Sequence, residues 1–289
     1  MVVDMPDETR ILRLTAFAAD PSGGNPAGVV LDASALTDSD MQRIAASLGY
    51  AETAFLTRPP TRKDPGRAGI RYFSPTAEVP FCGHATIATA VALAGRGDAE
   101  TFVFETNIGE VRITTRRTAD GIVASFTSVE PQVEPIGVSV LEHLLRLLAV
   151  DAADLHPDYP PMLAFAGNVH PVLVFAETAT FDGFRFDPAQ VRALMDAQGW
   201  AGTVTTLRVV GPLEFEARNL FPVGTMTEDP ATGSAAASVG GYLRALGLID
   251  APARVLIRQG RHVGRPSLLT VDIPEKGGIV VSGTASVIS

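Results

Sequence analysis

Two stretches of the chain, residues 85–95 and 234–243, carry no charged residue, whereas the segments around them alternate apolar and polar positions. Alternation with a period of two is typical of half-buried strands. A helix without a polar face is normally buried on all sides. The pattern therefore predicts one buried helix in each half of the chain, surrounded mainly by strands.

The turn that leads into each uncharged stretch occurs twice at a constant spacing. Pro80 and Gly83 precede the first stretch, and Pro230 and Gly233 precede the second (230 − 80 and 233 − 83 both equal 150). An amphipathic helical pattern lies upstream of each copy. A repeat of this length is too long for a solenoid and indicates two similar domains.

These patterns predict an α+β fold of two pseudo-symmetric domains. Each domain is expected to be a curved mixed β-sheet, a half-open barrel, wrapped around its central buried helix. The segment 129–135 is rich in Pro and Glu and has linker character. We therefore expect an N-terminal half at residues 1–130 and a C-terminal half at 131–277, with the last strand, 278–289, as a candidate to complete the N-terminal half.

Composition and charge narrow the class of protein. The net charge is −9 and the chain contains no run of Lys or Arg, which argues against a nucleic-acid partner. The single cysteine, Cys82, excludes an intrachain disulfide and fits a reducing compartment. The acidic start of the chain is unlike a secretory signal, and the uncharged run at 79–95 is typical of a core helix rather than a membrane span. We expect a cytoplasmic protein without a membrane partner.

Several kinds of cofactor chemistry lack their sequence signals. The two lysines, Lys63 and Lys276, lie in a polar loop and a turn, which argues against a pyridoxal-phosphate Schiff base. No glycine-rich nucleotide-binding motif is present. The five histidines are scattered without the spacing of metal ligands. The sequence therefore predicts neither a metal nor another cofactor.

Buried helix starts offer a different kind of site. The first backbone N–H groups of a helix have no partner within it and carry a partial positive charge, so they bind anions. Two such starts facing each other across a domain cleft would hold a small carboxylic acid and stabilise an enediolate-like transition state. The remaining requirement is a group that moves the proton.

Glu52 is the first candidate for that group. A structural alternative is a solvated carboxylate at the end of a helix. Its neighbours, Ala51 and residues 53–56, are mostly apolar, and the position at the same offset in the second half is Gly202. The two halves thus differ in this acid, which favours a functional role for Glu52.

Other candidates lie at the two helix starts, each with a structural alternative. His84 could be only a hydrogen-bonded residue that caps the first helix, and Asp229 only a carboxylate favoured by the second helix start. Ser234 or Thr232 could cap that second helix. Cys82 could be a small buried residue, although a thiol beside a helix N-terminus has a lowered pKa.

These residues form motifs that resemble the PhzF-like (phenazine biosynthesis) isomerases, which are similar in fold to diaminopimelate epimerase. The resemblance covers nearly the whole chain. Its most specific match is the run of residues 228–235, Glu-Asp-Pro-Ala-Thr-Gly-Ser-Ala. The other matching motifs are Ala16-Phe17, Gly24-Asn25-Pro26-Ala27, Glu52-Thr53-Ala54-Phe55, Arg71-x-Phe73-x-Pro75-x-x-Glu78, Cys82-Gly83-His84-Ala85-Thr86, Gln259-Gly260 and Gly264-Arg265-Pro266-Ser267.

The resemblance implies two domains, an active site between them, and a homodimer. It assigns the catalytic glutamate to Glu52, the site histidine and its neighbouring glycine to His84 and Gly83, and the site aspartate and serine to Asp229 and Ser234. The enzyme that gives the family its name moves a proton between carbons of a dihydro-hydroxyanthranilate ring without a cofactor.

We accordingly expect Glu52, His84 and Asp229 to be catalytic. Besides Gly83 and Ser234, the expected substrate-binding residues are Gly233, Cys82 and Asn25.

The chain departs from its cysteine-based relatives at the second helix start. Diaminopimelate epimerase and proline racemase carry a cysteine at both helix starts, whereas this chain has Cys82 at the first and Thr232 at the second. A mechanism with two thiols is therefore not available. A mechanism with one thiol, pairing Cys82 with Glu52 or Asp229, is the main chemical alternative.

Three hypotheses about function follow from the sequence. The first is a cofactor-independent isomerase of a small carboxylic acid. The second is an amino-acid epimerase or racemase that uses Cys82. The third is a non-catalytic protein that binds small acids.

Overall fold

The computed structural model of the chain describes residues 11–97, 99–223 and 226–288, and they divide into two compact units. Unit 1 contains the described residues up to Ala18, those within Asn25–Thr127 and those from Ser282 onward; unit 2 contains those within Ala19–Gly24 and Ser128–Val281.

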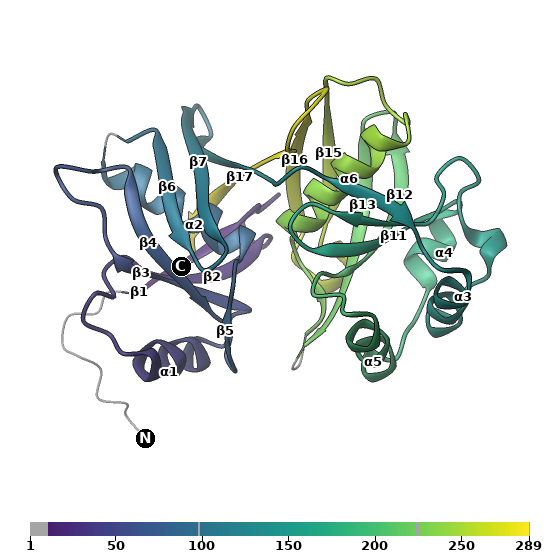
Figure 1. Cartoon of the computed structure of the whole chain (residues 1–289), viewed down its shortest axis with the longest axis horizontal. Helices are drawn as coiled ribbons and strands as arrows, with labels where there is room; N and C mark the ends of the chain where they lie inside the picture. The colour runs from purple at the N-terminus through teal and green to yellow at the C-terminus, as the bar shows by residue number, and fades with distance from the viewer. Residues whose placement is uncertain (1–10, 98, 224–225, 289) are drawn as a thin grey trace. The chain divides into compact units, whose positions relative to one another are not determined.

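Unit 1 is a mixed sheet that closes on itself around one helix (Figure 1). Its pairings run from β1 through β2, β3, β4, β6, β7 and β8 to β17, and β17 pairs with β1 again. The elements are β1 (Ile11–Ala16), β2 (Asn25–Val30), α1 (Asp38–Leu48), β3 (Glu52–Arg58), β4 (Arg67–Phe73), β5 (Glu78–Val79), α2 (Gly83–Arg96), β6 (Thr101–Thr106), β7 (Gly109–Thr118), β8 (Gly121–Thr127) and β17 (Val280–Val287).

Unit 2 repeats this plan. The elements are β9 (Gln132–Pro135), α3 (Val138–Leu147), the 3₁₀ helix η1 (Ala152–Asp154), β10 (Met162–Phe165), β11 (Val169–Phe175), α4 (Thr178–Gly183), α5 (Pro188–Gln198), β12 (Val204–Gly211), β13 (Glu214–Val223), β14 (Met226–Asp229), α6 (Gly233–Ala245), β15 (Ala253–Gln259), the 3₁₀ helix η2 (Arg261–Val263) and β16 (Ser267–Ile273).

The strand pairings show the duplication directly. In unit 1, β2 runs parallel to β3 and β4 parallel to β6, while β1–β2, β3–β4 and β6–β7 are antiparallel. In unit 2, β11 runs parallel to β12 and β13 parallel to β15, while β10–β11, β12–β13 and β15–β16 are antiparallel. The α+β fold of two similar units, each with a mixed sheet and a central helix, is confirmed.

Residues next to helices α1 and α5 set where these two helices begin and end. The hydroxyl of Thr37 accepts from the backbone N–H of Asp40 and caps α1, and the carboxylate of Asp187 caps α5 in the same way. Gly49 and Gly199 end the two helices in the left-handed conformation. The two glycines are 150 positions apart, so the repeat seen in the sequence is also a repeat of helix ends.

The central helices α2 and α6 are buried along most of their length, as the uncharged stretches predict. Helix α2 packs against β1, β2, β3, β7 and β8, and α6 packs against β9, β10, β11 and β16. In α2 the hydroxyls of Thr86 and Thr89 donate to carbonyls one turn earlier, at 2.7 Å each, so the polar atoms of this buried helix are paired. Figure 1 shows each helix running inside the strands of its own unit.

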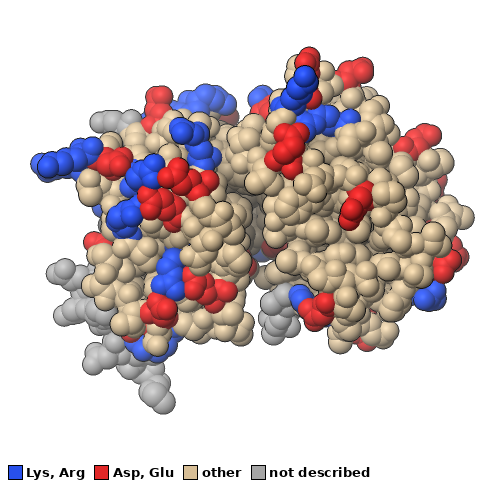
Figure 2. Space-filling model, in the orientation of Figure 1, with Lys and Arg blue, Asp and Glu red and all other residues tan. Residues whose placement is uncertain are grey.

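Charged side chains of both signs stand side by side on the face of unit 1 drawn in Figure 2. The described residues of its sheet include ion pairs such as Arg67 with Glu105 and Glu110, at 2.7 Å each. Exposed ion pairs contribute about 0–1 kcal/mol each. The buried apolar residues of the two units are therefore the main source of stability.

One local prediction was wrong. The segment 129–135, interpreted as a linker, includes strand β9, whose residues Gln132–Pro135 pair with β10 in antiparallel register. Pro and Glu reduce the propensity for strand formation, but β9 gains a neighbouring strand and contacts α6, and this tertiary environment overrides the propensity. Within the described ranges, no helix is long and apolar enough to cross a membrane.

Candidate active site

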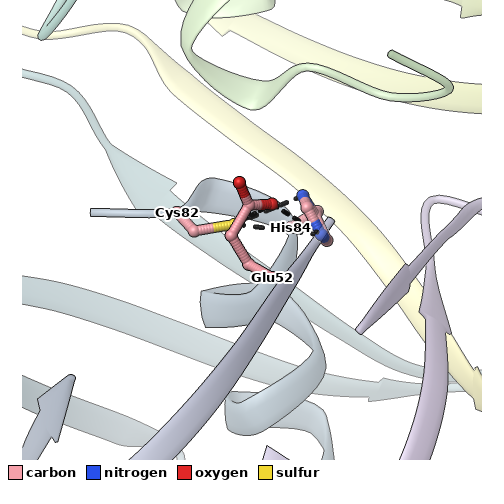
Figure 3. Close-up of side chains that lie close together, drawn as sticks. All are labelled: Glu52, Cys82 and His84. Atoms are coloured by element: carbon pink, nitrogen blue, oxygen red, sulfur yellow. Dashed lines mark hydrogen bonds and ion pairs between the residues drawn. The ribbon is translucent and has the colours of Figure 1, made fainter. Parts of the chain in front are cut away.

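Three side chains from two separate segments of unit 1 meet at the start of helix α2. Cys82 is the N-cap residue of the helix, His84 is its second residue, and Glu52 is the first residue of strand β3. Figure 3 shows the three side chains pointing toward one another. The fold thus brings together residues that lie 30 positions apart in the sequence.

The distances within this cluster place every polar group near the other two. Cys82 Sγ lies 3.4 Å from Glu52 Oε2 and 3.3 Å from His84 Nδ1. His84 Nε2 lies 3.6 Å from Glu52 Oε2. The thiol is within hydrogen-bonding distance of both partners, whereas the imidazole and the carboxylate are slightly farther apart than a direct hydrogen bond requires. A small movement of one side chain brings the carboxylate and the imidazole into contact.

His84 is neutral at pH 7 because its surroundings disfavour the charged imidazolium. Burial lowers the pKa of His84 to about 4, and a hydrogen bond to the backbone carbonyl of Pro26 only partly opposes that effect. A neutral imidazole offers one N–H donor and one lone pair. The carboxylate of Glu52, whose side chain is 14% exposed, therefore has an uncharged imidazole as its neighbour at pH 7.

The other predicted residues of unit 1 lie around the same point. Gly83 is the first residue of α2, and Asn25 is the buried first residue of β2. Strand β2 runs beside β3 with Ala27 opposite Glu52, and its Pro26 carbonyl holds His84. All five unit 1 residues predicted from the sequence are thus gathered at one helix start.

The start of α2 has the properties of an anion site. Among the described residues, no side chain caps the helix and no acidic residue lies in its first turn. The first backbone N–H groups and the positive end of the helix dipole therefore favour a negatively charged group there.

The same cluster also has the composition of a metal site. One donor atom from each of Glu52, Cys82 and His84 lies within 4.8 Å of the others, and carboxylate, thiolate and imidazole are all zinc ligands. The spacing of histidines along the sequence did not reveal this donor set, because its members come from two segments. The absence of a metal cofactor stays a prediction.

In unit 2 the start of α6 is organised around Asp229, at the end of β14. The hydroxyl of Thr232 donates to Asp229 Oδ2 at 2.5 Å. Gln259 Nε2 donates to the backbone carbonyl of Asp229 at 2.6 Å and to Thr232 Oγ1 at 3.0 Å, and Gln259 Oε1 accepts from the Thr232 N–H at 3.2 Å. This buried network fixes the turn that leads into Gly233, the first residue of α6.

Ser234 does not cap α6. The N-cap residue is Thr232, and in the described structure neither hydroxyl makes a capping hydrogen bond to the first turn. The hydroxyl of Thr232 is directed to Asp229 instead, and Ser234 Oγ lies 3.1 Å from His170 Nε2. The capping role considered for these two residues is therefore wrong, because Asp229 and Gln259 take the hydroxyl of Thr232 and His170 takes that of Ser234.

Two residues of the unit 2 network, His170 and Gln259, received no role from the sequence. Gln259 stands in a motif of the resemblance but lies 27 positions from Thr232. His170 lies in the apolar strand β11 and is fully buried. Its one sequence signal is a polar residue inside a run of apolar residues.

A matching ion pair supports the turn before each helix. Arg71 makes a two-pronged contact with Glu78 at 2.7 Å per bond, and Arg218 makes the same kind of contact with Glu228, as close as 2.6 Å. The Arg218–Glu228 pair is buried, and Arg218 Nη1 also donates to the Phe181 carbonyl at 2.8 Å. Paired guanidinium and carboxylate groups hold a planar geometry, so they position β5 and β14 ahead of the helix starts.

Comparison with known proteins agrees with this structure. The chain is 33% identical over 290 residues to an uncharacterized isomerase of Deinococcus radiodurans, covering 96% of this chain and 92% of the relative. It is 31% identical over 257 residues to the trans-2,3-dihydro-3-hydroxyanthranilate isomerase of Pseudomonas fluorescens, covering 89% of this chain and 87% of that enzyme.

A solved structure extends the comparison to the fold. A predicted epimerase from Pseudomonas aeruginosa superimposes with a TM-score of 0.84 at 28% identity over 98% of both chains. The model of the PhzC-PhzF family, described as phenazine biosynthesis-like protein, matches residues 14–289. The chain therefore belongs to the PhzC-PhzF family of phenazine biosynthesis-like proteins, and it is an isomerase.

Proposed function

We propose that this isomerase moves a proton between carbons of a small carboxylic acid without a cofactor, and that Glu52 takes and returns the proton. The observation that carries the proposal is the position of the Glu52 carboxylate. It lies beside a thiol and a neutral imidazole, 3.4 Å and 3.6 Å away, at the positive start of a buried helix.

The reaction is balanced without an external oxidant or reductant. The carboxylate of Glu52 removes a proton from one carbon, and the electron pair of the broken C–H bond spreads into the adjacent unsaturated acid. The protonated Glu52 then returns the proton to another carbon. The neutral His84 donates its one N–H to the Pro26 carbonyl, which leaves its other ring nitrogen to accept a hydrogen bond from the substrate.

The two helix starts favour a small carboxylic acid as the class of substrate. Anions are stabilised at the first turn of a helix, and a transition state that carries more negative charge is stabilised further. We propose that Gly83 of α2 and Gly233 and Ser234 of α6 bind the acid, with Asp229 assisting the proton transfer. That the two helix starts act on one substrate stays a prediction from the duplication, as do the homodimer and the cytoplasmic location.

The direct test is exchange with solvent deuterium. The substrate named for the Pseudomonas fluorescens relative, trans-2,3-dihydro-3-hydroxyanthranilate, is incubated in D₂O with the wild-type protein and with Glu52→Gln, and deuterium incorporation is followed by NMR. We expect the rate to fall by roughly 10²- to 10⁴-fold in the variant, the usual contribution of a positioned acid–base group. Affinity for the stable aromatic analogue 3-hydroxyanthranilate, measured by calorimetry, should stay the same.

Glu100→Gln is the matched control, because it makes the same chemical change at an exposed turn. Equal exchange rates in wild type and Glu52→Gln would remove Glu52 from the mechanism. Binding without exchange in the wild type would instead show that this acid is a ligand of the isomerase but not its substrate.

A second candidate function is an epimerase that uses the thiol of Cys82. The observation that favours it is the position of Cys82 as the N-cap residue of α2, because a helix N-terminus stabilises a thiolate. Among the described residues at the second helix start, Thr232 supplies a hydroxyl where a two-thiol enzyme has its other cysteine. Such an enzyme would therefore need Glu52 or Asp229 as its second proton-transfer group.

A further inference from the structure

His170 is a fully buried imidazole whose two nitrogens contact two different parts of unit 2. Its Nδ1 lies 3.0 Å from the backbone N of Thr203, 3.1 Å from the carbonyl oxygen and 3.0 Å from Oγ1 of the same residue. Its Nε2 lies 3.1 Å from Ser234 Oγ, 64 positions away at the start of α6. The ring therefore connects strand β11 and the residue before β12 to the start of the central helix.

The ring of His170 packs closely against the glycine at position 202. A Cβ atom at Gly202 would lie 2.6 Å from His170 Cε1 and 2.8 Å from Nδ1, which no side chain tolerates. The absence of a side chain at Gly202 thus makes room for the imidazole. Thr203, which contacts His170, is itself held in place, because its hydroxyl donates to Oδ1 of the buried Asn219 at 2.6 Å.

The charge state of His170 is also fixed. Burial lowers its pKa to about 4, with the backbone hydrogen bond at Thr203 opposing the effect. The ring is therefore neutral throughout the range in which most enzymes work, and a neutral imidazole makes one hydrogen bond as donor and one as acceptor. The contact to Ser234 is therefore made by a neutral ring at pH 7.

Ser234 needs such a partner to keep one orientation. A serine hydroxyl rotates among three staggered positions, and near a helix start it competes for backbone groups of its own helix. The structure shows it turned to His170 rather than to the first turn of α6. Its remaining hydrogen-bonding capacity is thereby directed to one place at the helix start.

We propose that His170 is a positioning residue of this isomerase, which acts on the bound acid only through the hydroxyl of Ser234. This inference rests on the proposed function of the α6 start as part of the substrate site. It adds a residue that contacts no substrate and whose ring, with the Val169 carbonyl, fills the space that a side chain at position 202 would need.

The first experiment tests the contact itself, whether or not the chain turns over the chosen acid. The protein is labelled with ¹⁵N-histidine, and the Nε2 signal of His170 is compared in wild type, Ser234→Ala and Tyr242→Phe. Tyr242 lies on α6, as Ser234 does, and its hydroxyl donates to the Pro160 carbonyl at 3.0 Å. Tyr242→Phe therefore removes a hydrogen bond of α6 that does not involve His170. We expect a shift of the signal in Ser234→Ala alone, and an unchanged signal there would overturn the proposal.

The second experiment is a double-mutant cycle on binding of 3-hydroxyanthranilate. The variant His170→Asn keeps a polar atom at the place of Nδ1, but its side chain is too short to reach Ser234. In His170→Gln the longer side chain reaches the place of Nε2. We expect Ser234→Ala and His170→Asn each to weaken binding by about tenfold, the scale of one hydrogen bond to a charged group. His170→Gln should recover part of the loss.

The decisive comparison is the double variant. If His170 acts only through Ser234, adding His170→Asn to Ser234→Ala should change affinity by less than about twofold. Independent losses that multiply in the double variant would show a merely structural role and overturn the proposal. A wild-type protein that neither binds the analogue nor exchanges deuterium into the substrate would count against the proposed function, while the imidazole signal would still report on the contact.

Discussion

Helix α2 begins at Gly83 beside a thiol, an imidazole and a carboxylate, whereas helix α6 begins at Gly233 beside hydroxyl groups, a buried amide and a carboxylate that accepts from one hydroxyl. The backbone plan of the two starts is the same, and the ion pair before each is also the same. The side chains differ in what they can do with a proton. Unit 1 brings a thiol, an imidazole and a carboxylate together, whereas in unit 2 the carboxylate of Asp229 is held in a network of hydrogen bonds with Thr232 and Gln259.

The difference is clearest at positions 52 and 202. The helices α1 and α5 end at Gly49 and Gly199, so the chain leaves both in equivalent ways. Three residues later, unit 1 has the acid of Glu52 and unit 2 has Gly202, whose missing side chain leaves room for the ring of His170. After duplication, one copy thus carries an acid at this place, and the other leaves room for an imidazole that contacts a serine.

The largest effect that we expect concerns a feature shared by the two units, their buried neutral histidines. Burial lowers the pKa of His84 and of His170 from 6.5 to about 4. Between these values the unfolded chain binds a proton that the folded chain excludes, so the free energy of unfolding falls as the pH falls from about 6.5 to about 4. The loss is on the order of 3 kcal/mol per histidine, at about 1.4 kcal/mol per pKa unit.

Urea unfolding at pH 7, 6 and 5 measures this dependence in wild type, His84→Gln and His170→Gln. Each variant should lose part of the slope, by a similar amount for the two units. His143→Gln, on the exposed side of α3, is the control. A slope that is the same in all four proteins would show that these two histidines are protonated as easily in the folded chain as in the unfolded chain.

A smaller effect is expected from filling the space at position 202. In Gly202→Ala the new Cβ would lie 2.5 Å from the Val169 carbonyl oxygen and 2.6 Å from the ring of His170. Overpacking of this kind costs about 1–3 kcal/mol in the free energy of unfolding. Denaturant unfolding checks the value, with Gly183→Ala as the control, because a Cβ there meets no atom within 4 Å. Equal stability of the two variants would mean that both the Val169 carbonyl and the ring of His170 give way at no cost.

The smallest effect should come from the thiol. If Glu52 moves the proton, Cys82→Ser should keep the deuterium-exchange rate within about tenfold of wild type, because serine places a hydrogen-bonding hydroxyl where the thiol was, near Glu52 and His84. Thr232→Ser makes a comparably mild change at the second helix start and serves as the matched variant. A loss of about 10³-fold or more in Cys82→Ser alone would favour the thiol-based epimerase.

Local chemistry made part of this molecule predictable from the sequence. Thr37 and Gly49 delimit α1 through contacts within a few residues, and the uncharged stretches identify α2 and α6 because a helix without a polar face must be buried. The motif around Cys82 and His84 placed two members of the unit 1 cluster next to each other in sequence. Residues 129–135 show the limit, since their composition favours a linker and the neighbouring strand β10 makes part of them a strand.

What the sequence by itself determined is the repeat, the buried helices and the residue types at the two helix starts, because each of these depends on neighbours a few positions away. Only the tertiary structure decided which of those residues meet. Glu52 reaches Cys82 because β3 passes the start of α2, and His170 reaches Ser234 because β11 passes the start of α6. Such contacts join segments tens of residues apart, and their partners are set by strand register and packing rather than by local sequence.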